Sequence, residues 1–112
     1  MAQLLIDADT VTVSLSRAEK VQAVHGDVTV PRSAIVGARV VQDGMTEVHG
    51  IRAPGTSLPG VVLVGTWRQA GRTTFAVCHG TKPALVVDLK DAPFDRLVVT
   101  VDDPERAVAD LR

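Results

Sequence analysis

Three histidines and one cysteine are the side chains of this sequence best suited to holding a metal ion or to nucleophilic catalysis. Cys78 and His79 are adjacent. Adjacent side chains of a strand point to opposite faces of the sheet, so this pair does not serve a single site. His25 and His49 lie far away in the sequence. We therefore expect a buried Cys78, no metal site, no cofactor and no cysteine–histidine catalytic pair.

Two pairs of aspartates have a spacing that a catalytic acid and base can use, but each pair has a structural explanation. Asp102 and Asp103 precede the expected start of a helix, where aspartate is favoured as a cap. Asp91 and Asp95 lie in a turn. Carboxylate pairs that cleave sugars lie in grooves rich in aromatic residues, and this chain has only two Phe, one Trp and no Tyr. We therefore predict no catalytic residues and no enzyme activity.

The segment RAPGTSLPG, residues 52–60, raises the question of whether it binds a ligand or only turns the chain. It is not a Walker loop, because no Gly-Lys-Ser/Thr follows it. Pro54-Gly55 and Pro59-Gly60 each place proline before a residue that tolerates positive φ, as the two central positions of a type II turn require. The sequence favours an ordered surface loop between two strands, fixed by these four residues.

Two versions of this loop are considered, one structural and one functional. In the structural version the turns aim Thr56 and Ser57 outward, and Leu58 folds back onto the core. In the functional version Arg52 and the amides around Thr56 and Ser57 grip one carboxylate or phosphate, because turn amides can point together at an anion. The alternative function is a small hydrolase or transferase that uses residues 52–60 with His49 as its base.

The composition is that of one globular domain, residues 1–112. The hydrophobic share is 46% and the charged share 22%, which suits a single core without a metal or a disulfide. The net charge is -1, and the 12 basic residues are scattered among 13 acids, so neither nucleic acid nor an anionic membrane is an expected partner. We see no signal peptide and no apolar stretch of the ~20 residues that span a bilayer. The expected location is therefore the cytoplasm.

Most of the sequence has the pattern of short β-strands. Residues 10–16, TVTVSLS, alternate strictly, with Val11, Val13 and Leu15 on one face. The preceding LLIDA is a weaker strand candidate. QAGR is expected to be the turn of a hairpin, and Trp67 is expected in the core. Further strands are predicted at DVTV, AIVGARVVQ, VVLVGTW, TTFAVCH, ALVVDL and RLVVTV.

A short early helix is predicted after Ser16. Ser16 and Glu19 have the spacing of a capping box, in which each residue bonds the backbone N–H of the other. Gly26 is available to end the helix. The apolar side of this helix is expected to consist of Ala18, Val21 and Val24.

A second helix is predicted at the C-terminal end of the sequence. Asp103, Pro104 and Glu105 combine an N-cap, a proline at the first helical position and an acid in the first turn. This helix is expected to cover an open end of the sheets. Its apolar side is expected to consist of Ala107, Val108 and Leu111.

The short turns between strands favour an antiparallel sandwich or a partly open barrel. The segments GDVTVPRSAI, RAPGTSLPG, GTW and KPALVVDLKDAPFDRLVVTVDDPERAVADL together resemble the bacterial pleckstrin-homology-like (PH-like) proteins, the actinobacterial type especially. The resemblance covers the chain from Ser16 onward and is most specific between Lys82 and Leu111. It implies a mainly β fold of about seven strands in two antiparallel sheets, with a C-terminal capping helix.

The resemblance implies a non-enzymatic binding or scaffold module. Lipid-binding PH domains use basic residues clustered between their first two strands, where this chain has only Asp9. Arg17 and Lys20 follow, but on the predicted helix beside Glu19. An open barrel leaves strand edges, which pair with peptides or with a second copy of the same chain. We therefore expect a protein or peptide partner, or a homo-oligomer.

Overall fold

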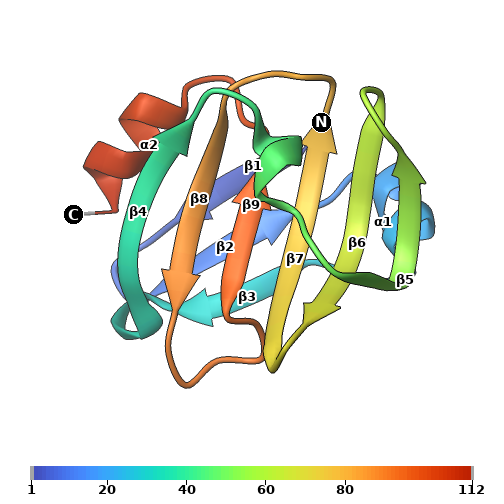
Figure 1. Ribbon diagram of the computed structural model, residues 1–112. Coiled ribbons are helices and arrows are strands. Elements are labelled where there is room, and N and C mark those ends of the chain that lie inside the picture. The colour runs from blue at the N-terminus through green and yellow to red at the C-terminus, as the bar shows by residue number, and fades with distance from the viewer. Residues whose placement is uncertain (1, 112) are drawn as a thin grey trace.

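The chain folds into two β-sheets and two helices, as the computed structural model, which describes residues 2–111, shows (Figure 1). One sheet has three strands in the order β1-β2-β3, and the other has six in the order β4-β8-β9-β7-β6-β5. The first sheet contains β1 (Gln3–Ile6), β2 (Thr10–Ser14) and β3 (Val28–Pro31). The second contains β4 (Ile35–Val41), β5 (Ile51–Leu58), β6 (Val62–Gln69), β7 (Arg72–His79), β8 (Ala84–Leu89) and β9 (Arg96–Val99). The helices are α1 (Arg17–Ala23) and α2 (Pro104–Asp110).

The mainly β architecture of two packed sheets with a C-terminal helix confirms the fold class expected from the sequence. Residues 2–111 form nine strands instead of about seven, because the weak candidate β1 does form and residues 51–58 are strand β5. Strand β9 also gives the second sheet one parallel pairing, with β7. It lies between β7 and β8, which run in opposite directions, so it must be parallel to one of them. The expectation of wholly antiparallel sheets is wrong at this pair.

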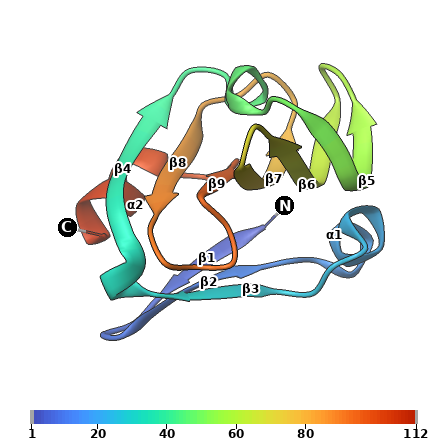
Figure 2. The same ribbon diagram turned by 60° about the horizontal axis from the view of Figure 1, so that its bottom comes forward.

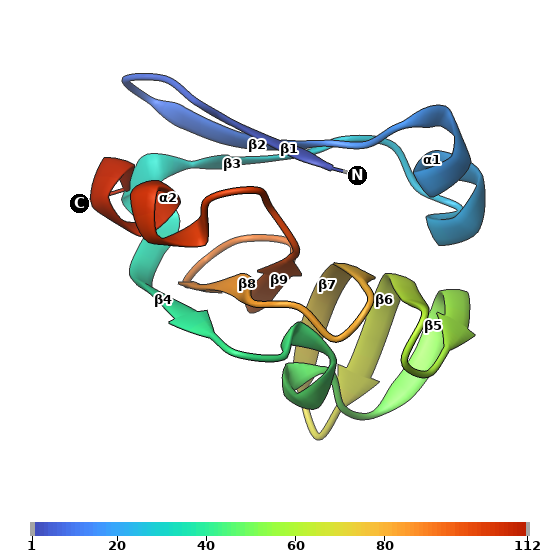
Figure 3. The ribbon, with the colours of Figure 1, turned by 90° about the horizontal axis from the view of Figure 1, so that it is seen from above.

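One face of the six-stranded sheet is covered in three parts (Figures 2 and 3). The three-stranded sheet crosses its middle. Helix α1 covers the side formed by β5 and β6, and α2 covers the side formed by β4 and β8. We call the covered face the inner face and the opposite one the outer face.

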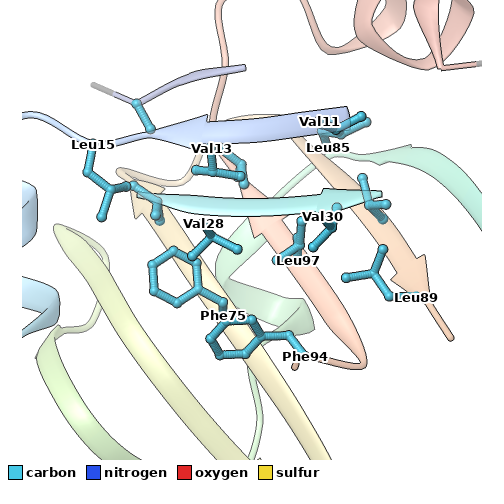
Figure 4. Packing of buried hydrophobic residues seen from close by; sticks show 14 of the residues in the cluster. Val11, Val13, Leu15, Val28, Val30, Phe75, Leu85, Leu89, Phe94 and Leu97 are labelled. Carbon is cyan, nitrogen blue, oxygen red and sulfur yellow. The ribbon is translucent and has the colours of Figure 1, made fainter. Parts of the chain in front are cut away.

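The main core lies between the two sheets (Figure 4). The alternating side of β2 supplies Val11 and Val13, which are 1% and 0% exposed, as the sequence predicted. They pack with Phe75 of β7 and Leu97 of β9 in the same cluster. The core residues labelled in Figure 4 are Val11, Val13, Leu15, Val28, Val30, Phe75, Leu85, Leu89, Phe94 and Leu97.

A second, smaller cluster of buried residues lies on the outer face. It includes Trp67, which is 6% exposed, and Cys78, which is fully buried, so both expectations of core positions are confirmed. A short 3-10 turn, Gly44–Glu47, covers the cluster, and Met45 packs against it. The backbone approaches closely here, since a Cβ added at Gly44 would lie 2.7 Å from the Cβ of Ala84.

The capping box of α1 forms as predicted, but the buried side of the helix is different. Ser16 N donates to Glu19 Oε1 at 2.8 Å, and Glu19 N donates to Ser16 Oγ at 3.2 Å. Glu19 and Ala23 are the buried residues, whereas Val21 and Val24 are 78% and 70% exposed. The predicted apolar side is therefore wrong, because the Glu19 side chain turns inward. The predicted end at Gly26 is also wrong: the helix ends at Ala23, and its C-cap Val24 adopts a left-handed conformation with φ 52°.

Helix α2 has the predicted cap and the predicted buried side. Asp103 Oδ1 accepts a hydrogen bond from Arg106 N at 3.1 Å, and Pro104 is the first helical residue. Ala107 is buried, and Val108 and Leu111 pack against the main core. The helix therefore completes the cover of the inner face beside β4 and β8.

Ending the chain at Asp103 should destabilise the fold. Fully burying a large aliphatic side chain stabilises a protein by roughly 1.5–3 kcal/mol, and Val108 and Leu111 are partly buried. We expect the free energy of unfolding, measured by urea denaturation, to fall by about 2–4 kcal/mol. An unchanged denaturation midpoint would show that α2 does not stabilise the sheets.

Candidate functional site

Residues 52–60 form an edge strand and its turn, so the predicted loop between two strands is wrong. Residues 51–58 are β5, which pairs with β6. Only the second predicted turn is present: Val61 N donates to Leu58 O at 2.9 Å, and Gly60 has a φ of 81°. Pro59 and Gly60 thus occupy its central positions. Leu58 is 55% exposed, so it does not fold back onto the core.

Pro54 and Gly55 belong to a β-bulge instead of a turn. The register between β5 and β6 shifts between Arg52 and Gly55, and Gly55 then pairs with Gly65. A Cβ added at Gly65 would lie 2.5 Å from Gly55 Cα and 2.5 Å from the Pro54 carbonyl oxygen. Gly55 and Gly65 are therefore required because the two strands approach closely. Proline and glycine occur in edge bulges as well as in turns, which is why the sequence alone suggested a loop.

Arg52, Thr56 and Ser57 do not converge on one ligand. Thr56 pairs with Val64, whose side chain lies in the main core, and Ser57 pairs with Leu63, which lies in the outer cluster. Paired residues share a face, so Thr56 points inward and Ser57 outward. Thr56 Oγ1 also donates a hydrogen bond to a backbone carbonyl of α1, that of Gln22, at 2.9 Å. This arrangement therefore does not let the three residues bind one anion together. Thr56 instead holds α1 against β5.

His49 is exposed and precedes β5. A strand rises by roughly 3.3 Å per residue, so the beginning of β5 lies more than about 15 Å from Ser57. This separation is too large for His49 to act as a base on a group held by Thr56 or Ser57, because a general base must lie within hydrogen-bond reach of the proton that it removes. The geometry does not favour the hydrolase or transferase hypothesis.

The other histidines and the cysteine occupy three separate environments. The His25 ring lies 5.2 Å from the ring of Phe75, centroid to centroid. Cys78 points into the outer cluster, whereas His79 contacts α1 over the inner face. Burial raises the pKa of Cys78 to about 12, which keeps the thiol protonated and unreactive. Residues 2–111 contain no group of three or more His, Cys, Asp or Glu side chains placed to hold a metal ion.

The sequence did not reveal a contact between a buried carboxylate of α1 and a histidine of β7. The Glu19 side chain is 2% exposed, and its Oε2 lies 2.6 Å from His79 Nε2, whose side chain is 29% exposed. Glu19 Oε1 accepts from Ser16 N, so both carboxylate oxygens have partners. Burial opposes the charge of Glu19, but the hydrogen bonds from Ser16 and His79 outweigh it and hold the pKa of Glu19 below its ordinary value.

The Glu19–His79 pair has a structural role. It attaches the beginning of α1 to the end of β7, and Thr56 attaches the end of α1 to β5. The backbone N–H of His79 also donates to Thr100 Oγ1 at 3.2 Å. The capping-box spacing identified Glu19, but nothing local in the sequence connects it with a histidine 60 positions later.

The strand edges differ in how well they are protected against pairing with another chain. The edge strands are β1 and β3 in the first sheet, and β4 and β5 in the second. Strand β5 has Pro54 and a bulge, β4 has a bulge and packs against α2, and β3 ends at Pro31. Prolines, bulges and covering elements prevent strand addition. The four residues of β1 contain no proline, glycine or bulge, so β1 is the edge best suited to accept a strand.

A groove of about 300 Å³ runs between β1 and α2. Residues 2–6 form one wall, and residues 101–103, 106, 107 and 110 form the other. The Arg32 guanidinium closes one end of the groove, because Nη1 donates to the Asp7 carbonyl at 3.1 Å and Nη2 donates to the Asp110 carbonyl at 3.0 Å. Arg32 thus fixes the end of α2 next to the end of β1, and both elements end on the same side of the molecule (Figures 1 and 3).

The backbone of β1 offers hydrogen bonds along this groove. Asp7 N donates to Thr10 O at 3.0 Å, which makes these two residues a hydrogen-bonded pair at the end of the hairpin. Hydrogen-bonded and non-hydrogen-bonded pairs alternate in antiparallel sheets, so Leu5 bonds to β2. Leu4 and Ile6 then direct their N–H and C=O groups away from β2. Within residues 2–111 these outward groups form no hydrogen bond to another segment.

The candidate functional site is therefore the β1 edge together with its groove, which sequence reasoning missed.

Among the described residues no helix has the length and apolar character needed to cross a bilayer. Comparisons with protein-family models, with curated proteins and with solved structures gave no match for this chain.

Replacing Glu19 with glutamine should remove a pH-dependent part of the stability. Glutamine can still cap α1, but it loses the charge that faces His79, so we expect a loss of about 2 kcal/mol at neutral pH. The lowered pKa of Glu19 means that the ionised carboxylate stabilises the fold fully above pH 4.5, and that this contribution is lost as the pH falls through the lower pKa of the folded state.

The measurement is the free energy of unfolding in urea as a function of pH. The parent protein should lose stability below pH 4.5 more steeply than the Glu19→Gln variant. Glu105→Gln, an exposed change on α2, is the matched control and should follow the parent protein. Parallel curves for the parent and Glu19→Gln would contradict the role given to the Glu19 carboxylate.

Gly65→Ala should destabilise the fold by about 2–3 kcal/mol, because the new methyl group would overlap the backbone of β5. Gly26→Ala is the control, since a Cβ there meets no atom within 4 Å, and it should change the stability by less than about 0.5 kcal/mol. Thermal denaturation of both variants measures the difference. Equal melting temperatures would refute the close approach of β5 and β6.

Proposed function

We propose that this chain is a non-enzymatic PH-like binding module that takes an extended segment of a partner protein as a strand added to β1. The observation that carries the proposal is the free, regular edge of β1 beside a groove whose other wall is α2. An added strand gains main-chain hydrogen bonds from the edge, and its alternate side chains enter the neighbouring groove. Leu4 and Ile6 supply the outward N–H and C=O groups for these bonds.

The groove exists before any partner binds, which favours binding. The side chains of Leu4 and Ile6 pack against the main core, and β2 holds β1 from the other side. Arg32 links the ends of β1 and α2. A site that is already ordered loses less conformational freedom when a partner binds, so more of the interaction energy appears as affinity.

The PH-like assignment rests on the sequence resemblance, and two packed sheets with a C-terminal helix agree with it. We propose no lipid ligand, because the turn between β1 and β2 contains acidic residues, Asp7 and Asp9, where lipid-binding relatives are basic. We also propose a cytoplasmic location, since the free thiol of Cys78 suits a reducing compartment.

The test uses a synthetic peptide with blocked ends, Thr-Val-Gln-Val-Thr-Val, and NMR spectroscopy of the full chain. We expect chemical-shift changes in β1 and along α2, together with slower hydrogen exchange of the Leu4 and Ile6 amides. Two variants of the peptide carry N-methyl groups on alternate residues, one on the odd and one on the even positions. An added strand uses every second amide for its hydrogen bonds to the edge, so one of these variants should lose the effects and the other should keep them.

Two results would overturn the proposal. One is the absence of any effect on β1 at saturating peptide. The other is an effect confined to a different edge, such as β5. Self-association through β1 would appear as a concentration-dependent dimer without peptide. The strand added to β1 would then come from a second copy of this chain and not from a different protein.

A further inference from the structure

We infer that the groove selects an extended segment that carries a basic residue on the side facing α2. This inference rests on strand addition at β1, and it names the chemical class of the partner. The β1 wall supplies the backbone hydrogen bonds, which every sequence can make. The α2 wall supplies the charges, which distinguish one sequence from another.

The charged residues that line the groove are all on the α2 side. Asp102, Asp103 and Asp110 contribute carboxylates, and Arg106 contributes the one cation among the lining residues. Arg106 Nε lies 3.9 Å from Asp110 Oδ2, an exposed i,i+4 pair. Asp103 caps the helix through one oxygen. The groove therefore has an excess of negative charge, and Asp102 has no cation among the described ion pairs.

The groove end does not cancel this excess. Arg32 closes the end by binding two carbonyl oxygens, and it lies beside the Asp7 carboxylate, whose pKa is lowered mainly by hydrogen bonds from Thr10 and Asp9. The positive charge of Arg32 is thus balanced by the negative charge of Asp7. The β1 wall, residues 2–6, carries no charged side chain.

The alternation of strand side chains determines where the basic residue must lie. Paired residues of neighbouring strands point to the same face. The side chains of Leu4 and Ile6 point toward the core and α2, whereas Leu5 is 53% exposed on the other face. Every second residue of an added strand will therefore face α2. A lysine or arginine there can lay its aliphatic part along Ala107 and place its charge next to an aspartate.

Two other classes of ligand fit the groove less well. A phosphate group, whether of a lipid or of a nucleic acid, would be repelled by the excess carboxylates. A second copy of this chain would offer the uncharged edge of its own β1, which leaves the aspartates of both copies without cations.

The experiment compares three peptides on the full chain by NMR titration: Thr-Val-Lys-Val-Thr-Val, its glutamine counterpart and its glutamate counterpart. One ion pair in a solvated groove changes affinity by about fivefold, so the lysine peptide should bind about fivefold more tightly than the glutamine peptide. The glutamate peptide should bind about fivefold more weakly than the glutamine peptide. Raising the salt concentration should reduce these differences.

Variants of the groove wall formed by residues 101–110 identify the carboxylates responsible. Asp102→Asn and Asp110→Asn should each weaken binding of the lysine peptide, by up to about fivefold, and leave binding of the glutamine peptide unchanged. Glu105→Gln is the matched control, because it removes one negative charge from the first turn of α2, close to Asp102 in the sequence, but outside the groove. Both aspartates are exposed and neither caps α2, so the variants are expected to fold.

The outcomes separate this inference from the proposed function. If all three peptides bind at β1 with equal affinity, the charge selection is wrong and strand addition remains. If the glutamate peptide binds most tightly, or if Glu105→Gln weakens binding as much as Asp102→Asn, the selection is also wrong. If none of the peptides binds at β1, strand addition itself fails and this inference fails with it.

Discussion

The structure depends on covering a wide sheet with a smaller one. The strands of the three-stranded sheet run across those of the six-stranded sheet (Figure 1). Strands in a sheet lie roughly 4.8 Å apart, so the six-stranded sheet is about 24 Å wide. The crossing strands have only 4 or 5 residues and therefore span roughly 13–17 Å of this width. The inner face of the wide sheet carries Phe75, Leu85, Leu97 and other residues that are almost completely buried. The three-stranded sheet alone leaves both sides of this face open to water. The two helices complete the cover, one on each side.

Each helix is too short to be stable by itself, so its attachment to the sheets determines whether the cover forms. Helix α1 is attached by a buried carboxylate, Glu19, which caps the helix and contacts His79. A buried carboxylate that loses a hydrogen-bond partner costs free energy, so this contact holds α1 in one position. Helix α2 relies on apolar packing and on Arg32 instead, and the cover is incomplete where it meets β1.

Local patterns in the sequence predicted the elements, and distant contacts decided how they were arranged. The alternation of TVTVSLS, the capping box at Ser16 and the cap at Asp103 each involve residues within a few positions, and all three are present. The position of β9 between β7 and β8 depends on pairings that no local pattern specifies. The inward turn of α1 likewise depends on His79. Residues 52–60 were misinterpreted because proline and glycine occur in edge bulges as well as in turns.

The groove is the part of the molecule that sequence reasoning was least able to find, because its two walls come from opposite ends of the chain. Neither wall is distinctive alone: β1 is a four-residue strand, and α2 is a short capped helix. Arg32 joins them through backbone carbonyls, which do not titrate. The groove width is therefore independent of the side-chain carboxylates of α2. Those carboxylates remain available for a partner, so one contact maintains the shape of the groove and other residues give it its charge.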